Sequence, residues 1–301
     1  MTAPVDVIVP VYGESPFLGQ ALDGALAQEP APARVIVVDN GSPEPLRLDQ
    51  RHAGRCELIR REVRGGPATG RAAGLERSDA ALVALLDSDD VWEPGKLAAQ
   101  LEAFERHPDA GLCFGAAVVV DEGDRPTGER FAQVEPGVHA AAHIGRSLLR
   151  RNPICTSSTV MPRTVLDAAG GFDHPATDDL GCWMRLAETG APFVFEPRAR
   201  IRYRRHAEGY SYDVRVGARL ALAALDAHGH VLDEPERREL RRDWLTLMAR
   251  GEFRARRWPE GRRALRDAAR EARLAPRERV LGVAAAVPGV RSALGRRDAH
   301  G

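Results

Sequence analysis

The chain has 301 residues, and its 43 basic and 43 acidic side chains give a formal net charge of zero. This balance argues against a nucleic acid as the partner, because binding to a phosphate backbone relies on an excess of lysine and arginine. The length suits one large domain, or one domain with an appendage. The charge is unevenly distributed: residues 1–214 carry 23 basic and 31 acidic side chains (−8), and residues 215–301 carry 20 and 12 (+8).

The cysteines and the first residues indicate the compartment. Four widely spaced cysteines with no C-x-x-C pair are typical of small buried residues in a reducing compartment, not of a disulfide framework or a zinc site. The start of the chain lacks the basic and apolar segments of a signal peptide. No run of 18 apolar residues is present, so no membrane-spanning helix is predicted. We therefore expect a cytoplasmic protein.

Strands and helices alternate through about residue 105, which predicts a parallel sheet with helical crossovers. Strand patterns cover residues 5–11, 34–39, 56–60 and 81–86, and helical patterns cover residues 16–28, 67–77 and 95–106. Ser15 is the expected N-cap of the first helix, with Pro16 at its first position.

The pattern beyond residue 105 is less regular. A strand at 111–120 precedes a polar segment, residues 121–150, that we predict to be a variable loop near an acceptor. Further strands are expected at 154–161 and 193–195, and further helices at 163–169 and 178–188. From residue 211 onward the apolar spacing is helical.

Three carboxylates follow the most apolar strand pattern. Asp87, Asp89 and Asp90 come directly after residues 81–86. In open α/β sheets, ligands bind at the carboxyl ends of the strands. Carboxylates this close repel one another unless a cation lies between them, and Mg²⁺ prefers such oxygen ligands. The sequence therefore predicts a cation site here, with a solvated acidic turn as the simpler alternative.

Eight motifs, taken in order, resemble the family 2 glycosyltransferases of the GT-A fold. They lie at residues 7–12, 37–42, 66–75, 86–90, 156–158, 170–173, 178–186 and 203–206. The resemblance covers about residues 4–212. It implies an α/β GT-A fold, with a mostly parallel mixed sheet flanked by helices, in which residues 1–212 form the catalytic domain and residues 213–301 a helical C-terminal extension.

The resemblance also implies an activity. We expect an inverting transfer of a sugar from a nucleotide-diphosphate donor, UDP-linked, to an acceptor hydroxyl. The expected cofactor is Mn²⁺ or Mg²⁺, and the expected partners are the nucleotide-sugar donor and a carbohydrate or glycolipid acceptor. Polysaccharide or glycolipid assembly is the usual setting of such enzymes.

The same resemblance assigns donor-binding residues. Asp39 would bind the nucleobase, and a carboxylate beyond a strand end can accept a hydrogen bond from a uracil ring N–H. Pro10 and Tyr12 would line the base, and Arg71 would pair with the diphosphate. The simpler alternatives are a turn-forming acid for Asp39 and a plain surface arginine for Arg71.

The D-x-D motif is formed by Asp87 and Asp89. By the resemblance, Asp89 is a metal ligand, Asp87 touches the ribose or metal-bound water, and Asp90 assists either role. His206 matches a histidine that completes the metal site in many GT-A enzymes. A plain surface histidine is the alternative for His206.

Two further acids, Asp178 and Asp179, open a predicted helix, where the helix dipole favours ionised carboxylates. The resemblance makes Asp179 the catalytic base and leaves Asp178 on the donor side. The alternative is that both acids only cap the helix. The chain departs from the usual family pattern at Ala72, at the Asp178–Asp179 pair itself, and at Leu180 and Gly181.

Two other functions fit parts of the sequence. The 87–91 segment also fits the nucleophile motif of haloacid-dehalogenase-like phosphatases, but that chemistry needs a separate lysine, and the only lysine, Lys96, lies close behind the motif. A non-catalytic nucleotide-sugar-binding protein is the second alternative. The basic C-terminal helices are candidates for peripheral contact with anionic lipid at the cytoplasmic membrane face, or for packing on the catalytic domain or on the second subunit of a homodimer.

Overall fold

The computed structural model describes residues 3–131, 134–172, 178–206, 209 and 213–279. Contacts within the chain separate two compact units, residues 1–206 and residues 207–301, and each is treated by itself. The assignment of catalysis to residues 1–212 and of an extension to residues 213–301 stays a prediction.

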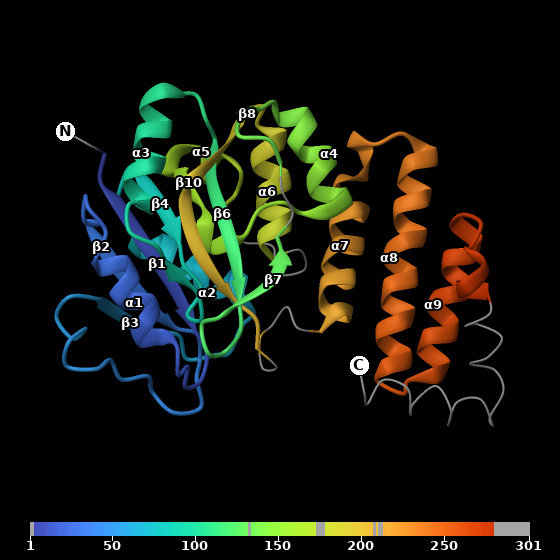
Figure 1. The fold of residues 1–301 in the computed structure, drawn as a ribbon, viewed down its shortest axis with the longest axis horizontal. Helices are drawn as coiled ribbons and strands as arrows, with labels where there is room; N and C mark the ends of the chain where they lie inside the picture. Colours follow the sequence, from blue (N-terminus) through green and yellow to red (C-terminus); the bar gives the residue numbers. More distant parts are fainter. Residues whose placement is uncertain (1–2, 132–133, 173–177, 207–208, 210–212, 280–301) are drawn as a thin grey trace. The chain divides into compact units, whose positions relative to one another are not determined.

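One mixed sheet forms the centre of the first unit (Figure 1). In the described part of the chain it has ten strands, in the order β3-β2-β1-β4-β9-β6-β10-β5, with β7 beside β6 and β8 beside β10. The pairs β1–β2, β2–β3, β1–β4 and β6–β10 are parallel. The strands are β1 Val5–Val11, β2 Arg34–Asp39, β3 Glu57–Arg60, β4 Leu82–Leu85, β5 Val91–Trp92, β6 Leu112–Val120, β7 Pro126–Arg130, β8 Gly137–His139, β9 Val160–Pro162 and β10 Phe193–Arg204.

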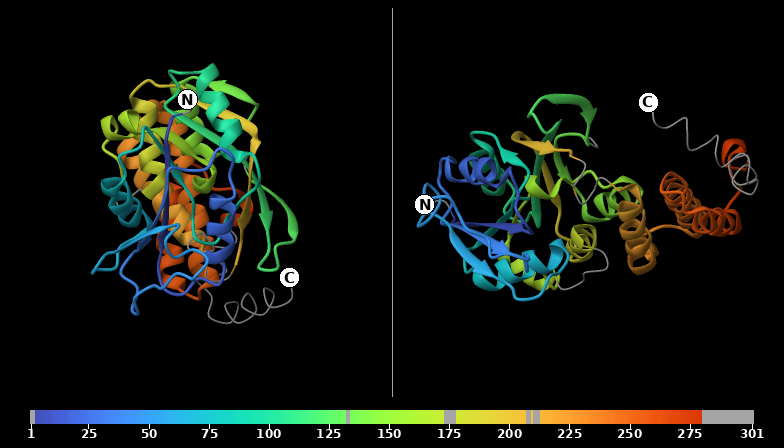
Figure 2. Two further views of the ribbon diagram at one scale, coloured as in Figure 1. Left: turned by 90° about the vertical axis from the view of Figure 1, so that its left-hand side faces the viewer. Right: turned by 90° about the horizontal axis from the view of Figure 1, so that it is seen from below.

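Helices cover both faces of this sheet, and the right-hand view of Figure 2 shows α1 and α2 on opposite sides of it. The helices of this unit are α1 Leu18–Leu26, α2 Pro67–Arg77, α3 Lys96–Arg106, α4 Ala141–Arg151, α5 Arg163–Ala168, α6 Asp178–Glu188 and the 3₁₀ segment η1 Thr156–Ser158. The mixed α/β sheet with flanking helices that the sequence predicted is confirmed.

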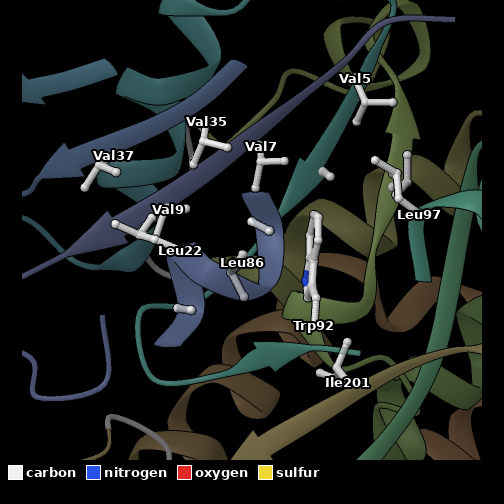
Figure 3. Packing of buried hydrophobic residues seen from close by; sticks show 14 of the residues in the cluster. Val5, Val7, Val9, Leu22, Val35, Val37, Leu86, Trp92, Leu97 and Ile201 are labelled. Atoms are coloured by element: carbon white, nitrogen blue, oxygen red, sulfur yellow. The ribbon is translucent and has the colours of Figure 1, made fainter. Parts of the chain in front are cut away.

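Alternation along the strands explains the two buried faces. Odd-numbered valines of β1 and β2 pack with Leu22 of α1, Leu97 of α3 and the indole of Trp92 (Figure 3). Even-numbered residues point to the other face, where Ile8 and Val38 lie against α2. Because both faces are covered, these strands are apolar at nearly every position.

The parallel strands end at one edge of the sheet. Val11, the last residue of β1, is the register partner of Asp39, the last residue of β2. Ile8 of β1 pairs with Leu85, the last residue of β4. The polar segments that follow these three strands therefore lie at the same edge.

The prediction of an irregular loop over residues 121–150 is wrong. Strand β7 pairs with β6 and β8 pairs with β10, both antiparallel. Helix α4 buries Ile144, Leu148 and Leu149 and packs against α6. The apolar spacing of these three side chains is the helical signal that the polar composition of the segment hid.

Three local predictions also need correction. Helix α1 begins at Leu18 rather than near Pro16, and Ser15 is not its N-cap; the Ser15 hydroxyl donates to the Ser88 carbonyl at 3.2 Å. The segment expected as a strand at 154–161 is interrupted by the 3₁₀ turn η1, and only its end, from Val160, belongs to a strand, β9. The strand expected at 193–195 extends to Arg204, which carries the chain back to the sheet edge.

The described residues of the second unit form three long helices: α7 Val214–His228, α8 Glu234–Arg254 and α9 Trp258–Glu271. Aspartates cap two of them, since Asp213 accepts from the backbone N–H of Arg215 and Asp233 accepts from that of Glu236. Helices α8 and α9 share a small apolar core formed by Ala249, Phe253, Ala264 and Leu265.

Arginines of the second unit pair with acids in the same unit. Arg250 contacts Glu278 at 3.0 Å, and Arg257 contacts Glu252 at 3.3 Å. Part of the positive charge is thus neutralised locally. No helix among the described residues is long and apolar enough to cross a membrane. Lipid contact through residues 213–301, and a homodimer, stay predictions.

We predict that Gly74→Ala lowers the free energy of unfolding by about 1–3 kcal/mol, because α2 lies too close to β1 for a methyl group. A Cβ at Gly74 would lie 2.3 Å from Cγ2 of the fully buried Ile8. Urea unfolding followed by circular dichroism measures the effect. Gly145→Ala in α4 is the matched control, since its Cβ would meet Ala187 at an ordinary 3.8 Å and should change stability by no more than about 1 kcal/mol, upward. Equal stability of Gly74→Ala and the wild type would contradict this packing.

Candidate active site

Several predicted site residues lie at the carboxyl edge of the sheet. Asp39 ends β2, residues 87–90 follow β4, and His206 follows β10. Asp178 and Asp179 open α6. Hydrogen bonds and ion pairs join most of them into one cluster.

The structure brings Asp89 and His206 together. The His206 Nε2 lies 3.0 Å from the Asp89 Oδ2. The Phe17 ring packs on the imidazole, with 5.3 Å between ring centroids. Burial and the neighbouring Asp87 charge raise the pKa of Asp89. A cation would stabilise the ionised form of this carboxylate, and the adjacent imidazole offers a second ligand atom.

No three metal-ligating side chains converge anywhere in the described ranges. The donor set nevertheless fits a divalent cation, because Asp89 offers a carboxylate oxygen and His206 an imidazole nitrogen. Mg²⁺ in proteins commonly takes few protein ligands and fills its other positions with water and phosphate oxygens. The metal roles of Asp89 and His206 stay predictions.

Asp90 faces the protein interior instead. It is 1% exposed, its Oδ1 accepts from the backbone N–H of Arg204 at 2.9 Å, and its Oδ2 accepts from the Ser157 hydroxyl. Burial raises the pKa of Asp90 well above its usual range, and Asp89 and Asp87 raise it further. Because Asp90 is buried and its oxygens face Arg204 and Ser157 in the interior, its metal role stays a prediction that this geometry does not support.

Arg71 bridges two of the predicted acids. Its guanidinium donates to Asp87 at 2.7 Å and to Asp178 at 2.9 Å. Arg71 is 3% exposed, so it is not the plain surface arginine considered above. Burial alone lowers the pKa of Arg71, but the charges of Asp87, Asp178 and Asp179 raise it overall. Two carboxylates occupy the side chain that was expected to bind the diphosphate.

One nitrogen of the Arg71 guanidinium takes no part in this bridge. In the described part of the chain, the buried Nε of Arg71 has no hydrogen-bond partner. Asp178, its partner in α6, adopts a left-handed backbone conformation with φ of 47°, which is uncommon for residues other than glycine. Burial, only partly offset by Arg71, raises the pKa of Asp178 to about 6.

Asp179 points in a different direction from Asp178. Its Oδ2 accepts from the Thr156 hydroxyl, and its Oδ1 accepts from the Leu180 backbone N–H at 2.7 Å. The side chain is partly exposed, unlike that of Asp178. In the 170–173 motif that precedes these acids, Gly170 and Gly171 have φ of 76° and 57°, and Asp173 lies outside the described residues.

Asp39 holds the turn that follows β2. Its Oδ1 accepts from the Ser42 N–H at 3.0 Å, and its Oδ2 accepts from the Leu46 N–H at 3.0 Å and from Arg60. Burial alone would raise the pKa of Asp39, but these hydrogen bonds lower it. Three donors leave about one of the four lone-pair positions for a nucleobase. The turn-forming role is therefore present, and the nucleobase role stays a prediction.

Tyr12 offers an aromatic face at the same edge. It is 42% exposed, and the Arg64 guanidinium carbon lies 4.0 Å from its ring centroid. Pro10 is partly buried beside Gly70, where an added Cβ would lie 2.9 Å from the proline Cβ. Base lining by Pro10 and Tyr12 stays a prediction.

Sequence reasoning missed three residues that hold this edge together. Arg204 donates to the Asp89 carbonyl at 3.0 Å and to Gln20 at 2.8 Å. Thr156 and Ser157 contact Asp179 and Asp90. All three residues belong to motifs that the sequence did single out, but their partners lie 23 to 184 positions away along the chain.

We predict that Arg71→Met lowers the free energy of unfolding by about 3–5 kcal/mol, because it leaves the buried Asp178 carboxylate and the partly buried Asp87 carboxylate uncompensated. Guanidinium chloride unfolding measures the change. The double variant Arg71→Met/Asp178→Asn should recover part of the loss, since one of the two charges is then removed. A single variant of unchanged stability but weakened diphosphate binding would instead favour the donor-binding role.

Comparisons with known proteins identify the family. Residues 6–164, more than half of the chain, match the profile of "Glycosyl transferase family 2". The chain is 30% identical over 211 residues to a pre-mycofactocin glycosyltransferase of Mycobacterium tuberculosis, covering 65% of this chain and 42% of that relative. It is 26% identical over 193 residues to TuaG of Bacillus subtilis, a putative teichuronic acid biosynthesis glycosyltransferase, covering 62% of this chain and 73% of that relative.

Among solved structures, S. aureus TarS residues 1–349 in complex with UDP-GlcNAc has a TM-score of 0.63 and 16% identity, covering 93% of this chain and 84% of that one. At this identity the likeness shows the fold alone. The family and the GT-A fold predicted from the motifs are thereby confirmed: this chain belongs to glycosyl transferase family 2.

Proposed function

We propose that this chain transfers a sugar from a nucleotide-diphosphate donor to an acceptor hydroxyl, with inversion at the sugar carbon. One observation carries the proposal. The D-x-D motif and the acids that open α6 form one connected cluster, in which Arg71 bonds both Asp87 and Asp178. A candidate metal pair and a candidate base thus share one site at the carboxyl edge of the sheet.

The donor side of the proposal rests on Asp89 and His206. These residues would hold Mn²⁺ or Mg²⁺, which when bound supplies positive charge to the leaving diphosphate. The ring face of Tyr12 would support the nucleobase, with Arg64 displaced from it or retained beside it. A UDP-linked donor is supported by the UDP-GlcNAc complex of the structurally similar TarS.

The acceptor side rests on Asp179. An acceptor hydroxyl keeps its proton in water at neutral pH, so a base is needed within about 2.6–3.2 Å of it. Asp179 is partly exposed and lies in the first turn of α6, where the helix dipole favours a carboxylate. In an inverting displacement, Asp179 takes the hydroxyl proton while the oxygen attacks the sugar carbon and the diphosphate departs.

The names of relatives support a polysaccharide setting, since TuaG is named a putative teichuronic acid biosynthesis glycosyltransferase. The chain spans 42% of the length of the mycobacterial relative and 38% of a second relative, the succinoglycan biosynthesis protein ExoW of Rhizobium meliloti. The acceptor and the activity of the whole protein are therefore proposals.

The phosphatase alternative needs a lysine at the site, and this chain does not provide one there. Lys96, the only lysine, is fully buried, and its ammonium lies 3.7 Å from the centroid of the Trp92 ring. Burial lowers the pKa of Lys96 well below its ordinary value. A side chain enclosed in the core against Trp92 cannot contact a phosphoryl group bound at Asp87. The non-catalytic binding protein is separated from the enzyme by slow metal-dependent release of UDP from a sugar nucleotide, which only the enzyme performs.

We expect Asp89→Ala to abolish turnover and the metal-dependent part of donor affinity, because the diphosphate then lacks charge compensation. Calorimetric titration of UDP with and without Mn²⁺ measures binding, and UDP release from a panel of sugar nucleotides measures turnover. Asp109→Ala, at an exposed turn after α3, is the control and should behave as the wild type. Full activity of the wild type in EDTA would remove the metal from the mechanism.

Asp179→Asn keeps the shape of the side chain but cannot accept the proton. With an acceptor identified from a glycan and glycolipid panel, kcat should fall by roughly 10²–10⁴ while the Kd for UDP barely changes. Asp178→Asn should lower kcat less. Near-normal turnover of Asp179→Asn with that acceptor would show that the base lies elsewhere.

A further inference from the structure

We propose that Thr156 and Ser157, in the 3₁₀ segment η1, are positioning residues that set the proposed base and the proposed metal loop relative to each other. The inference rests on the proposed function, since it assigns Asp179 as the base and Asp89 as a metal ligand. It concerns two hydroxyls, neighbours in sequence, that bond to opposite parts of the same site.

Thr156 fixes the Asp179 carboxylate. Its hydroxyl donates to the Asp179 Oδ2, while the Leu180 N–H donates to the Oδ1 at 2.7 Å. Each oxygen therefore has one protein donor, which holds the plane of the carboxylate and leaves lone pairs for an acceptor hydroxyl. Threonine suits this role because branching at Cβ restricts its χ1 rotation. Thr156 is 6% exposed, so water competes little for its hydroxyl.

Ser157 fixes the turn that carries Asp89. Its Oγ accepts from the Asp87 backbone N–H at 3.0 Å and donates to the Asp90 Oδ2. A serine hydroxyl has one proton to donate, and here that proton goes to Asp90. The two contacts join the first and last residues of the 87–90 turn, which is also closed by the Asp90 N–H to Asp87 carbonyl bond at 3.2 Å. Asp89 lies between the two fixed ends.

Two buried side chains hydrogen-bond to the backbone carbonyls of η1. The Trp92 indole N–H donates to the Ser157 carbonyl at 2.7 Å, and the Gln100 amide donates to the Ser158 carbonyl at 2.8 Å. Trp92 and Gln100 are buried. Because a 3₁₀ segment has three residues per turn, successive side chains point in well-separated directions. Thr156 and Ser157 can therefore bond to different neighbours from one rigid support.

This arrangement has a consequence for rate. Reacting groups must lie within a few tenths of an ångström of the productive geometry, and a displacement of 1 Å can cost about 10²-fold. Loss of the Thr156 hydroxyl frees Asp179 without touching the donor site. Loss of the Ser157 hydroxyl loosens the turn around Asp89 without touching Asp179. The two hydroxyls should therefore have separable kinetic effects.

The experiment compares three isosteric or near-isosteric variants of the full chain. Thr156→Val should lower kcat by about 10–100-fold with an unchanged KM for the donor, and Thr156→Ser should restore most of kcat. Ser157→Ala should weaken Mn²⁺-dependent UDP binding by about tenfold, measured by calorimetry without turnover. Thr159→Val is the matched control. In the described part of the chain its buried hydroxyl bonds only the Thr156 carbonyl, which also accepts from the Thr159 N–H. This control should keep both wild-type values.

Wild-type kcat in Thr156→Val, or an equal loss in Thr159→Val, would overturn the role of Thr156. Unchanged UDP binding in Ser157→Ala would overturn the role of Ser157. If Thr156→Val does not fold, Thr156→Ser and Thr156→Ala are compared, and equal kcat values for these two variants overturn the inference. If Asp179→Asn abolishes activity and Thr156→Val leaves it unchanged, this inference alone is refuted. If the wild-type protein has no transferase activity, the proposed function and this inference are refuted together.

Discussion

The site depends on the two ion pairs that the buried guanidinium of Arg71 forms with Asp87 and Asp178. The guanidinium lies between Asp87 and Asp178, 2.7 Å from one and 2.9 Å from the other, and is itself 3% exposed. Two carboxylates in a poorly solvated region repel each other unless a positive charge lies between them. Arg71 supplies that charge from α2, so it joins the turn after β4 to the first residue of α6. A cluster of acids can therefore persist at this edge without unfolding it.

The acids of this edge have different environments, and their pKa values follow from that. Asp39 accepts backbone N–H groups and Arg60, and these lower its pKa despite burial. Asp89 has an imidazole beside it, which offsets only part of the effect of burial and of the Asp87 charge. A cation bound between Asp89 and His206 would stabilise the ionised form of Asp89. Asp39, by contrast, already accepts hydrogen bonds from Ser42, Leu46 and Arg60.

Sequence reasoning found the fold and the acidic residues but not their partners. Runs of buried valine and leucine, together with ordered motifs, were enough for β1, β2, β4 and the α/β class. The role of Arg71 was invisible because Asp178 is 107 positions away. Nothing local distinguishes Asp89 from Asp90, since burial depends on how the turn meets Ser157 and Arg204. Residues 154–161 suggested a strand, but hydroxyls such as those of Ser158 and Thr159 bond nearby carbonyls and favour a turn.

The two sides of the site are supported unequally. The turn that carries Asp89 is held by Ser157 and by Arg204, whose guanidinium also bonds Gln20 of α1 and the carbonyl of Asp121 after β6. Elements distant in sequence therefore fix the proposed donor side. Within the residues that the structure describes, the Asp179 carboxylate accepts hydrogen bonds only from Thr156 and from the adjacent Leu180 N–H. A reaction common to a family needs a constant geometry where the diphosphate leaves, whereas the acceptor differs between members. A rigid donor side and a lightly supported acceptor side would let the acceptor contacts change without disturbing the bond-breaking step.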